Sequence, residues 1–251
     1  MPQVQMPLAE TDYATLGRPR AQFDQILEAL PDNTRYYAAN ATHRLAEVEW
    51  ITQNLEREVK ATGGPVTHEG LLSLQVYLLL TCADTLGHLY VEDGVKKRFK
   101  AFFTNLPDDG KRHLAHAVVV WQATLEDLDA WGLRDAATNT VKYPSLTDIQ
   151  QAIRPLSAED QMNAVIGFLF ARRNWYTHES EYPQLGHHPN LAVMHRTRLR
   201  VPNTATLSGL DRLQLIPDQG KLYVAYYLTD DVVSALRHVM LRGLARAVGI
   251  A

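Results

Sequence analysis

The sequence predicts an all-α fold, a helical bundle that carries one small C-terminal β-hairpin and a final helix. Three observations support this prediction. Apolar residues recur at helical spacing through most of the chain, two β-prone runs flank one turn sequence near residue 217, and no repeat or low-complexity tract intervenes. With 251 residues, 46% hydrophobic and 21% charged, the chain is long and apolar enough to bury a full core.

The N-terminal half predicts four helices after an irregular start. Residues 1–20 have no clear period and are expected to form a loose arm. Apolar residues at helical spacing predict a long amphipathic helix over 34–60. The stretch 69–91 is apolar almost all round, so it is expected at the centre of the bundle. Two further helices are predicted over 95–106 and 109–131.

The C-terminal half predicts a loop, two helix starts, a hairpin and a last helix. The stretch 132–144 is expected to be a loop. After it, "SLTD" and "SAED" each place a serine three residues before an aspartate, a helix-start pattern that makes Ser157 the expected start of one helix. "RLQLI" and "KLYVAYY" flank "PDQG", which predicts a hairpin, and a stripe of apolar residues predicts a helix over 230–248.

These elements predict three parts of the chain: a loose arm over 1–20, a helical bundle over 21–182, and an extension over 183–251. The extension would contain a basic loop, the hairpin and the last helix, packed on the bundle.

Composition also limits the cellular setting. No apolar run approaches the roughly 18 residues of a membrane span, and the N-terminus lacks the pattern of a signal peptide, so a cytoplasmic protein without membrane contact is expected. The single cysteine, Cys82, cannot form an intramolecular disulfide and is expected to be a packed core thiol. The net charge of −3 gives no overall attraction for nucleic acid, so any contact with RNA needs a local basic patch.

A polar cluster follows the apolar run "VIGFLF", in the segment "ARRNWYTHESEY" at residues 171–182. On a helical wheel, Arg173, Asn174 and His178 fall in one polar arc, whereas Trp175 lies outside it and can pack. Asn174 stands four residues before His178 and is the natural partner to orient its imidazole. A solvated helix end is the alternative interpretation, since arginine and histidine suit the C-terminus of a helix electrostatically.

The hexapeptide "RNWYTH", Arg173 to His178, resembles the R-x-x-x-x-H signature of the HEPN superfamily, in the form with asparagine directly after arginine. The resemblance extends over about 34–182, where "TCADTLGHLYVEDGVKKRFKAFF" is similar to the central helix and following turn of large HEPN-like families. It implies a HEPN-like helical bundle in which the signature lies on a late helix.

For function, the resemblance implies a metal-independent endoribonuclease that acts as a homodimer, in bacterial defence or toxin systems, with an antitoxin or defence-system partner. His178 would be the acid/base for attack by the ribose 2'-hydroxyl, and Arg173 would bind the phosphate. Asn174 would hold the histidine or the phosphate, and Arg172 would contact RNA nearby. Where HEPN toxins regulated by a nucleotidyltransferase have a tyrosine two residues after the histidine, this chain has Ser180, so that regulation is not expected.

Two other clusters bear on binding. An extended backbone in "HRTRLR" would direct Arg196, Arg198 and Arg200 to one side, as a ladder that could follow RNA phosphates; a solvated basic loop is the alternative. The histidine pairs of "HLAH" and "LGHH" lack a clear third ligand, so neither a metal nor another cofactor is expected.

Three hypotheses therefore remain open. The chain is a HEPN endoribonuclease, a HEPN-like module that binds nucleic acid or a partner without turnover, or an unrelated helical scaffold whose polar arc is plain surface.

Overall fold

The computed structural model divides the chain into two compact units. The helical unit comprises Met1–Leu114 and Asp231–Ala251, and the sheet unit comprises Ala115–Asp230. The structure describes residues 7–56, 68–132, 134–135, 137–138, 140–141, 146–178, 191–194, 197–200, 213–218, 221–229 and 231–250. The sheet unit is thus an insertion between two helices of the helical unit.

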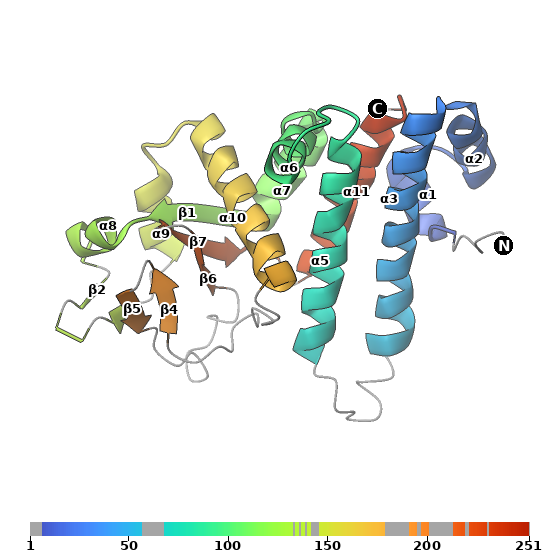
Figure 1. Ribbon diagram of the computed structural model, residues 1–251. Helices are drawn as coiled ribbons and strands as arrows, with labels where there is room; N and C mark the ends of the chain where they lie inside the picture. The colour runs from blue at the N-terminus through green and yellow to red at the C-terminus, as the bar shows by residue number, and fades with distance from the viewer. Residues whose placement is uncertain are drawn as a thin grey trace. The chain divides into compact units, whose positions relative to one another are not determined.

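The described part of the helical unit is built from helices (Figure 1). In chain order these are α1 (Glu10–Leu16), α2 (Arg20–Ala29), α3 (Asp32–Trp50), the π-helix η1 (Ile51–Glu56), α5 (His68–Gly87), α6 (Val95–Thr104), α7 (Asp108–Ala117) and α11 (Val232–Ala247). The boundary between the units falls inside α7, whose residues 115–117 belong to the sheet unit. The helix α5 packs on α3, α6 and α11, which confirms the central position predicted from its apolar sequence.

The core of the helical unit is closely packed at α6 and α11. Phe99, Phe102 and Phe103 of α6 are buried, as their amphipathic spacing predicts. Gly243 of α11 lies against the Phe102 ring, where a β-carbon would collide with the ring atoms. The absence of a side chain at Gly243 therefore sets how closely α11 approaches α6.

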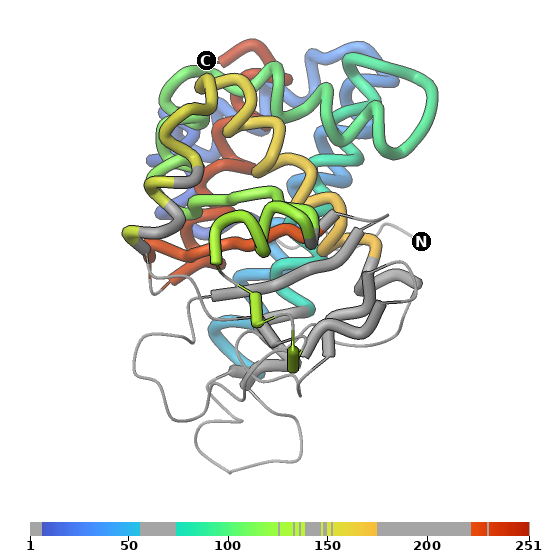
Figure 2. The backbone as a smooth tube through the Cα atoms, turned by 90° about the vertical axis from the view of Figure 1, so that its left-hand side faces the viewer, coloured from blue at the N-terminus to red at the C-terminus, as the bar shows by residue number. Residues whose placement is uncertain are grey.

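The sheet unit contains a three-stranded antiparallel sheet of order β1-β7-β6. Its strands are β1 (Val118–Ala123), β6 (Leu213–Asp218) and β7 (Lys221–Tyr227), and β1 pairs with β7 from Val118↔Tyr227 to Ala123↔Leu222. Figure 2 shows β1 and β7 side by side. The long helix α10 (Ala158–His178) packs on all three strands, while α8 (Leu125–Ala130) and α9 (Leu146–Ile153) pack on β1.

A second sheet in the same unit has the order β2-β3-β5-β4. Its short strands are β2 (Arg134–Asp135), β3 (Thr140–Val141), β4 (Leu191–Met194) and β5 (Thr197–Arg200). The β3–β5 pairing is parallel and the other two pairings are antiparallel.

Several predicted elements are confirmed. The strands β6 and β7 form the predicted hairpin, with Asp218 paired to Lys221 beside the turn. Ser157 starts α10 as predicted: its Oγ accepts from the Asp160 backbone N–H at 3.1 Å and donates to Asp160 Oδ2 at 2.7 Å. The last helix, α11, lies within the range predicted for it.

The fold is mainly helical, but the all-α class with a single hairpin is too simple. The helix predicted over 109–131 is wrong in its middle, because α7 ends at Ala117 and β1 follows before α8 begins. The three consecutive valines at 118–120 favour an extended backbone, and strand pairing with β7 stabilises it. The loop predicted over 132–144 contains β2 and β3.

The predicted division of the chain also differs from the observed one. The expected arm over 1–20 contains α1, whose Tyr13 and Leu16 are buried. The expected bundle over 21–182 is split after Leu114, so α10 belongs to the sheet unit. The expected extension over 183–251 is split as well, because its hairpin lies in the sheet unit and α11 lies in the helical unit.

Candidate functional site

The candidate site lies at the C-terminal end of α10. The middle of this helix is buried in the sheet unit, through Ala164, Val165, Ile166, Phe168, Leu169 and Ala171. Gly167 faces Tyr223 of β7, so close that a β-carbon at this position would collide with the tyrosine ring and hydroxyl. The buried part of α10 therefore lies directly on the sheet and fixes where its polar end begins.

Arg172 is the first polar residue of this end, and it is buried. Its side chain donates a hydrogen bond from Nη1 to the hydroxyl of Tyr227 on β7, and its guanidinium carbon lies 5.9 Å from the centre of the Tyr227 ring. Only 3% of Arg172 is exposed. Burial raises the pKa of the Tyr227 hydroxyl, against the opposing effect of the Arg172 charge, so the tyrosine stays neutral.

This geometry corrects the role expected for Arg172. An arginine that contacts RNA must reach phosphates at the surface, whereas Arg172 points into the interior and joins α10 to β7. We therefore assign Arg172 to the packing of the sheet unit and remove it from the RNA-binding residues.

Arg173 and Asn174 follow at partly exposed positions. Arg173 Nη1 donates a hydrogen bond to Asn174 Oδ1 at 3.2 Å. The side-chain carbonyl oxygen of Asn174 thus holds Arg173. A guanidinium fixed in this way is oriented before any anion binds, which lowers the cost of ordering it. The side chain of His178 lies outside the described residues, so the predicted contact of Asn174 with His178 or with the phosphate stays a prediction.

His178 is the last residue of α10, so the backbone of "RNWYTH" is helical throughout. Helical geometry places Arg173 and His178 about 140° apart around the axis and about 7.5 Å apart along it, far enough to lie on either side of a ligand. The side chains of Trp175 and His178 lie outside the described residues. Of the predicted polar arc, the structure therefore describes only the side chains of Arg173 and Asn174.

The basic ladder is placed only in its backbone. Arg198 and Arg200 lie on β5, opposite Val193 and Leu191 of β4, so the backbone over 197–200 is extended, where the sequence predicted a basic loop. Arg196 and the side chains of all three arginines lie outside the described residues. A shared phosphate-binding face for Arg196, Arg198 and Arg200 therefore stays a prediction.

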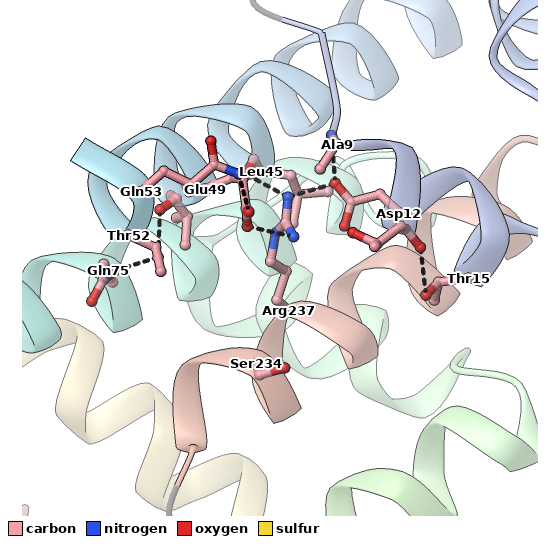
Figure 3. Close-up of polar contacts among 12 residues, drawn as sticks. Ala9, Asp12, Thr15, Leu45, Glu49, Thr52, Gln53, Gln75, Ser234 and Arg237 are labelled. Carbon is pink, nitrogen blue, oxygen red and sulfur yellow. Dashed lines mark hydrogen bonds and ion pairs between the residues drawn. The ribbon is translucent and has the colours of Figure 1, made fainter. Parts of the chain in front are cut away.

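A second charged cluster, which no sequence pattern indicated, lies in the helical unit and is centred on Arg237 of α11 (Figure 3). Arg237 Nη2 donates to Asp12 Oδ2 at 2.5 Å and to the Leu45 carbonyl at 3.4 Å, and Nη1 pairs with Glu49 Oε2 at 2.8 Å. Asp12 and Arg237 are 225 residues apart in the chain, so no local sequence pattern could predict that they pair.

Burial dominates the electrostatics of this cluster. Asp12 is 2% and Arg237 8% exposed. Burial raises the pKa of Asp12, while the Arg237 charge and the Ala9 backbone N–H oppose the rise. The polar contacts of Arg237 join α1, α3 and α11 to one another. We therefore assign the cluster a structural role, which is to hold these three helices together in the interior.

A further polar contact joins α5 to η1. Gln75 of α5, 1% exposed, donates to the Thr52 hydroxyl of η1 at 2.7 Å. The π-helix η1 widens the helical turn directly after α3 and presents Thr52 to this bond. The bond fixes the start of η1 against α5.

The described residues include histidines and one cysteine, the side chains that most often bind transition metals or act as nucleophiles. Among the residues that the structure describes, no three or more His, Cys, Asp or Glu side chains form a group able to hold a metal ion. His187 and His188 lie outside the described residues. Cys82 is fully buried, and burial raises its pKa to about 12, which confirms it as an inert core thiol.

Within the described part of the chain, no helix has both the length and the apolar character needed to cross a membrane.

Comparisons with protein-family models, with curated proteins and with solved structures found no match to this chain.

Proposed function

We propose that this chain is a metal-independent endoribonuclease of the HEPN type, in which Arg173 and His178 act on RNA in a site composed from two copies of the chain. His178 would take the proton from the ribose 2'-hydroxyl, and Arg173 would bind the phosphate as negative charge develops on it. Arg196, Arg198 and Arg200 would bind RNA beside the site. Defence or toxin systems are the proposed setting, with an antitoxin or defence-system partner.

One observation carries this proposal. The helix α10 runs unbroken to His178, and its polar end begins with Arg173 partly exposed and hydrogen-bonded to Asn174. A buried helix that ends in an oriented guanidinium and a histidine supplies a phosphate-binding group and a group that titrates near neutral pH. The sheet packed on α10 is a feature that the resemblance does not imply.

The test is cleavage of labelled RNA by the purified chain in excess EDTA. We expect cleavage to persist and the upstream product to end in a cyclic phosphate, because the 2'-hydroxyl is the attacking group. Complete inhibition by EDTA, or products with a 3'-hydroxyl, would indicate a metal-dependent mechanism instead.

The same preparation separates the alternatives. Salt-sensitive RNA binding without cleavage would favour the binding module, because phosphate contacts release counterions. Neither binding nor cleavage of RNA would favour the unrelated scaffold.

A further inference from the structure

Two helices of the helical unit, α7 and α11, are joined by two polar contacts. The rings of His113 and His238 stack, with centroids 4.1 Å apart and planes inclined by 29°. Four residues earlier on α7 and four later on α11, Asp109 Oδ2 pairs with Arg242 Nε at 2.7 Å. Because the numbers rise on one helix and fall on the other, the two segments run antiparallel.

Asp109, the carboxylate that acts on the pKa of His238, is already engaged in an ion pair with Arg242. Burial acts to raise the pKa of Asp109, but the Arg242 charge and hydrogen bonds outweigh it, so the net shift is downward. Asp109 is therefore ionised across the neutral range and paired with Arg242. The Asp109–Arg242 contact carries no net charge that could compensate a second imidazolium.

The charged groups around His238 favour its neutral form. Burial lowers its pKa most, His113 and Arg242 lower it further, and Asp109 partly opposes them. The preceding residue, Arg237, is bonded to Asp12 of α1 and Glu49 of α3. Asp12 and Glu49 are thus paired with Arg237, and among the groups that shift the pKa of His238 only Asp109 favours its protonation.

We propose that His113 and His238 form a pH-sensitive clasp, which holds α7 against α11 at neutral pH and releases it when both imidazoles become protonated. Stacked rings tolerate two neutral imidazoles or one imidazolium, whereas two positive charges at this separation repel each other. Both rings are half-buried, so water screens that repulsion incompletely.

The position of the clasp gives it a consequence for the chain. The chain leaves the helical unit after Leu114 and returns at Asp231, so α7 carries the outgoing connection and α11 directly follows the returning one. Inside the sheet unit, Leu228 N–H donates to the Ala117 carbonyl at 2.8 Å and β1 stays paired with β7. Opening of the clasp would therefore loosen α7 and α11 while this strand pairing persists.

The sign of the effect follows from proton linkage. The folded pKa of His238 lies below its unfolded value of 6.5, so the unfolded chain binds more protons in mildly acidic solution. The contribution of neutral His238 to stability is present above that unfolded value and is lost as the pH falls toward the folded pKa.

Hydrogen exchange on the full-length chain tests the proposal. After correction for intrinsic exchange, we expect the amide protection of α7 and the start of α11 to fall about tenfold or more between about pH 7.5 and pH 5. His238→Gln and His113→Gln each remove one imidazole of the stacked pair, so two positive charges can no longer meet there and each variant should show a markedly weaker pH dependence. The matched control is His43→Gln, a partly exposed histidine of α3 that pairs with Glu47 and lies outside the stacked pair, so this variant should keep the wild-type response.

Two results would overturn the clasp. One is an equal loss of protection in wild type and both glutamine variants. The other is an NMR titration of the wild-type imidazoles in which both rings become fully protonated while the protection of α7 is unchanged. The second measurement uses wild type alone, so it decides the question even if a variant fails to fold.

Discussion

At the scale of single residues, variants of Arg173 and His178 test whether these side chains act in catalysis or only stabilise the fold. If His178 transfers a proton, His178→Ala should lower RNA cleavage by about 100-fold or more, the scale for losing a general acid or base. Arg173→Lys keeps the charge but loses the planar fork of donors that Asn174 orients, so it should also be strongly impaired. Cleavage rates and melting temperatures of both variants beside wild type measure the two effects.

The control for these variants is Trp175→Ala, because the helical wheel places Trp175 outside the polar arc. The sequence predicts that its ring packs, and in that case truncation to alanine should cost about 3–5 kcal/mol of stability. His178→Ala protein that cleaves RNA at the wild-type rate would exclude His178 from catalysis. A large loss of melting temperature in that variant would make the histidine a structural residue.

Arg237 gives a prediction about stability alone. Arg237→Met removes the cation from the buried cluster and leaves Asp12 without its ion-pair partner, so it should destabilise the chain by about 3–5 kcal/mol. Arg35→Met is the control, since Arg35 forms an exposed ion pair with Asp32 and such pairs contribute about 0–1 kcal/mol. Chemical denaturation of both variants gives the comparison.

The double variant Asp12→Asn/Arg237→Met distinguishes the ion pair from simple packing. If the penalty in Arg237→Met comes from an uncompensated buried carboxylate, Asp12→Asn should recover part of it, because the amide carries no charge. If the loss of stability in the double variant equals the sum of the losses in Asp12→Asn and Arg237→Met, the two side chains do not interact energetically.

At the scale of elements, the contact of α10 with β7 depends on Gly167. Gly167→Ala places a methyl group against the buried Tyr223 side chain, so we expect a loss of about 1–3 kcal/mol despite the better helix propensity of alanine. Gly110→Ala on α7 is the control. Its β-carbon would meet the Arg242 Cβ at 3.4 Å, an ordinary contact distance, so little or no stability should be lost.

Tyr223→Phe in the Gly167→Ala background sharpens this test. It removes the hydroxyl, the atom nearest to the added methyl group, and should restore part of the lost stability. If Gly167→Ala is as stable as wild type, α10 and β7 do not approach each other as closely as described. Thermal melting curves of the single and double variants decide the matter.

Elements with strong local signals could be predicted from the sequence. The apolar stripe of α11, the Ser157 start of α10 and the β6–β7 hairpin each depend on residues close together in the chain. The strand β1 could not be predicted in the same way, because its partner β7 lies about a hundred residues away and no pattern near β1 indicates that pairing. The run of three valines was the one available signal.

The same distinction applies to the candidate site. Arg173 and Asn174 were found because a helical wheel reports residues on one helix. The burial of Arg172 was missed, because the wheel does not contain Tyr227 of β7. The cluster of Asp12, Glu49 and Arg237 was missed for the same reason, since it joins three helices from distant parts of the chain.

At the scale of the whole molecule, the division into two units follows from chain order. The helical unit is completed only when α11 returns to pack on α1, α3 and α5, after the entire sheet unit has intervened. A reading along the sequence therefore joins α10 to the preceding helices, whereas packing assigns it to the strands. The prediction of one bundle over 21–182 failed on long-range contacts while the helices themselves were mostly correct.

Dimerisation is the prediction at this scale, and it rests on the proposed function. Each chain supplies one Arg173 and one His178, while in-line transfer at a phosphate needs groups on both sides, so two copies are expected to form the site around a two-fold axis. Light scattering at micromolar concentration should then give about twice the chain mass of 28.3 kDa. Mixing His178→Ala chains with Arg173→Lys chains probes the composite site directly, because mixed dimers combine the intact arginine of one copy with the intact histidine of the other. Partial recovery of cleavage in the mixture is the expected result, whereas a monomer that cleaves RNA at full rate would contradict the composite site and leave each α10 to act alone.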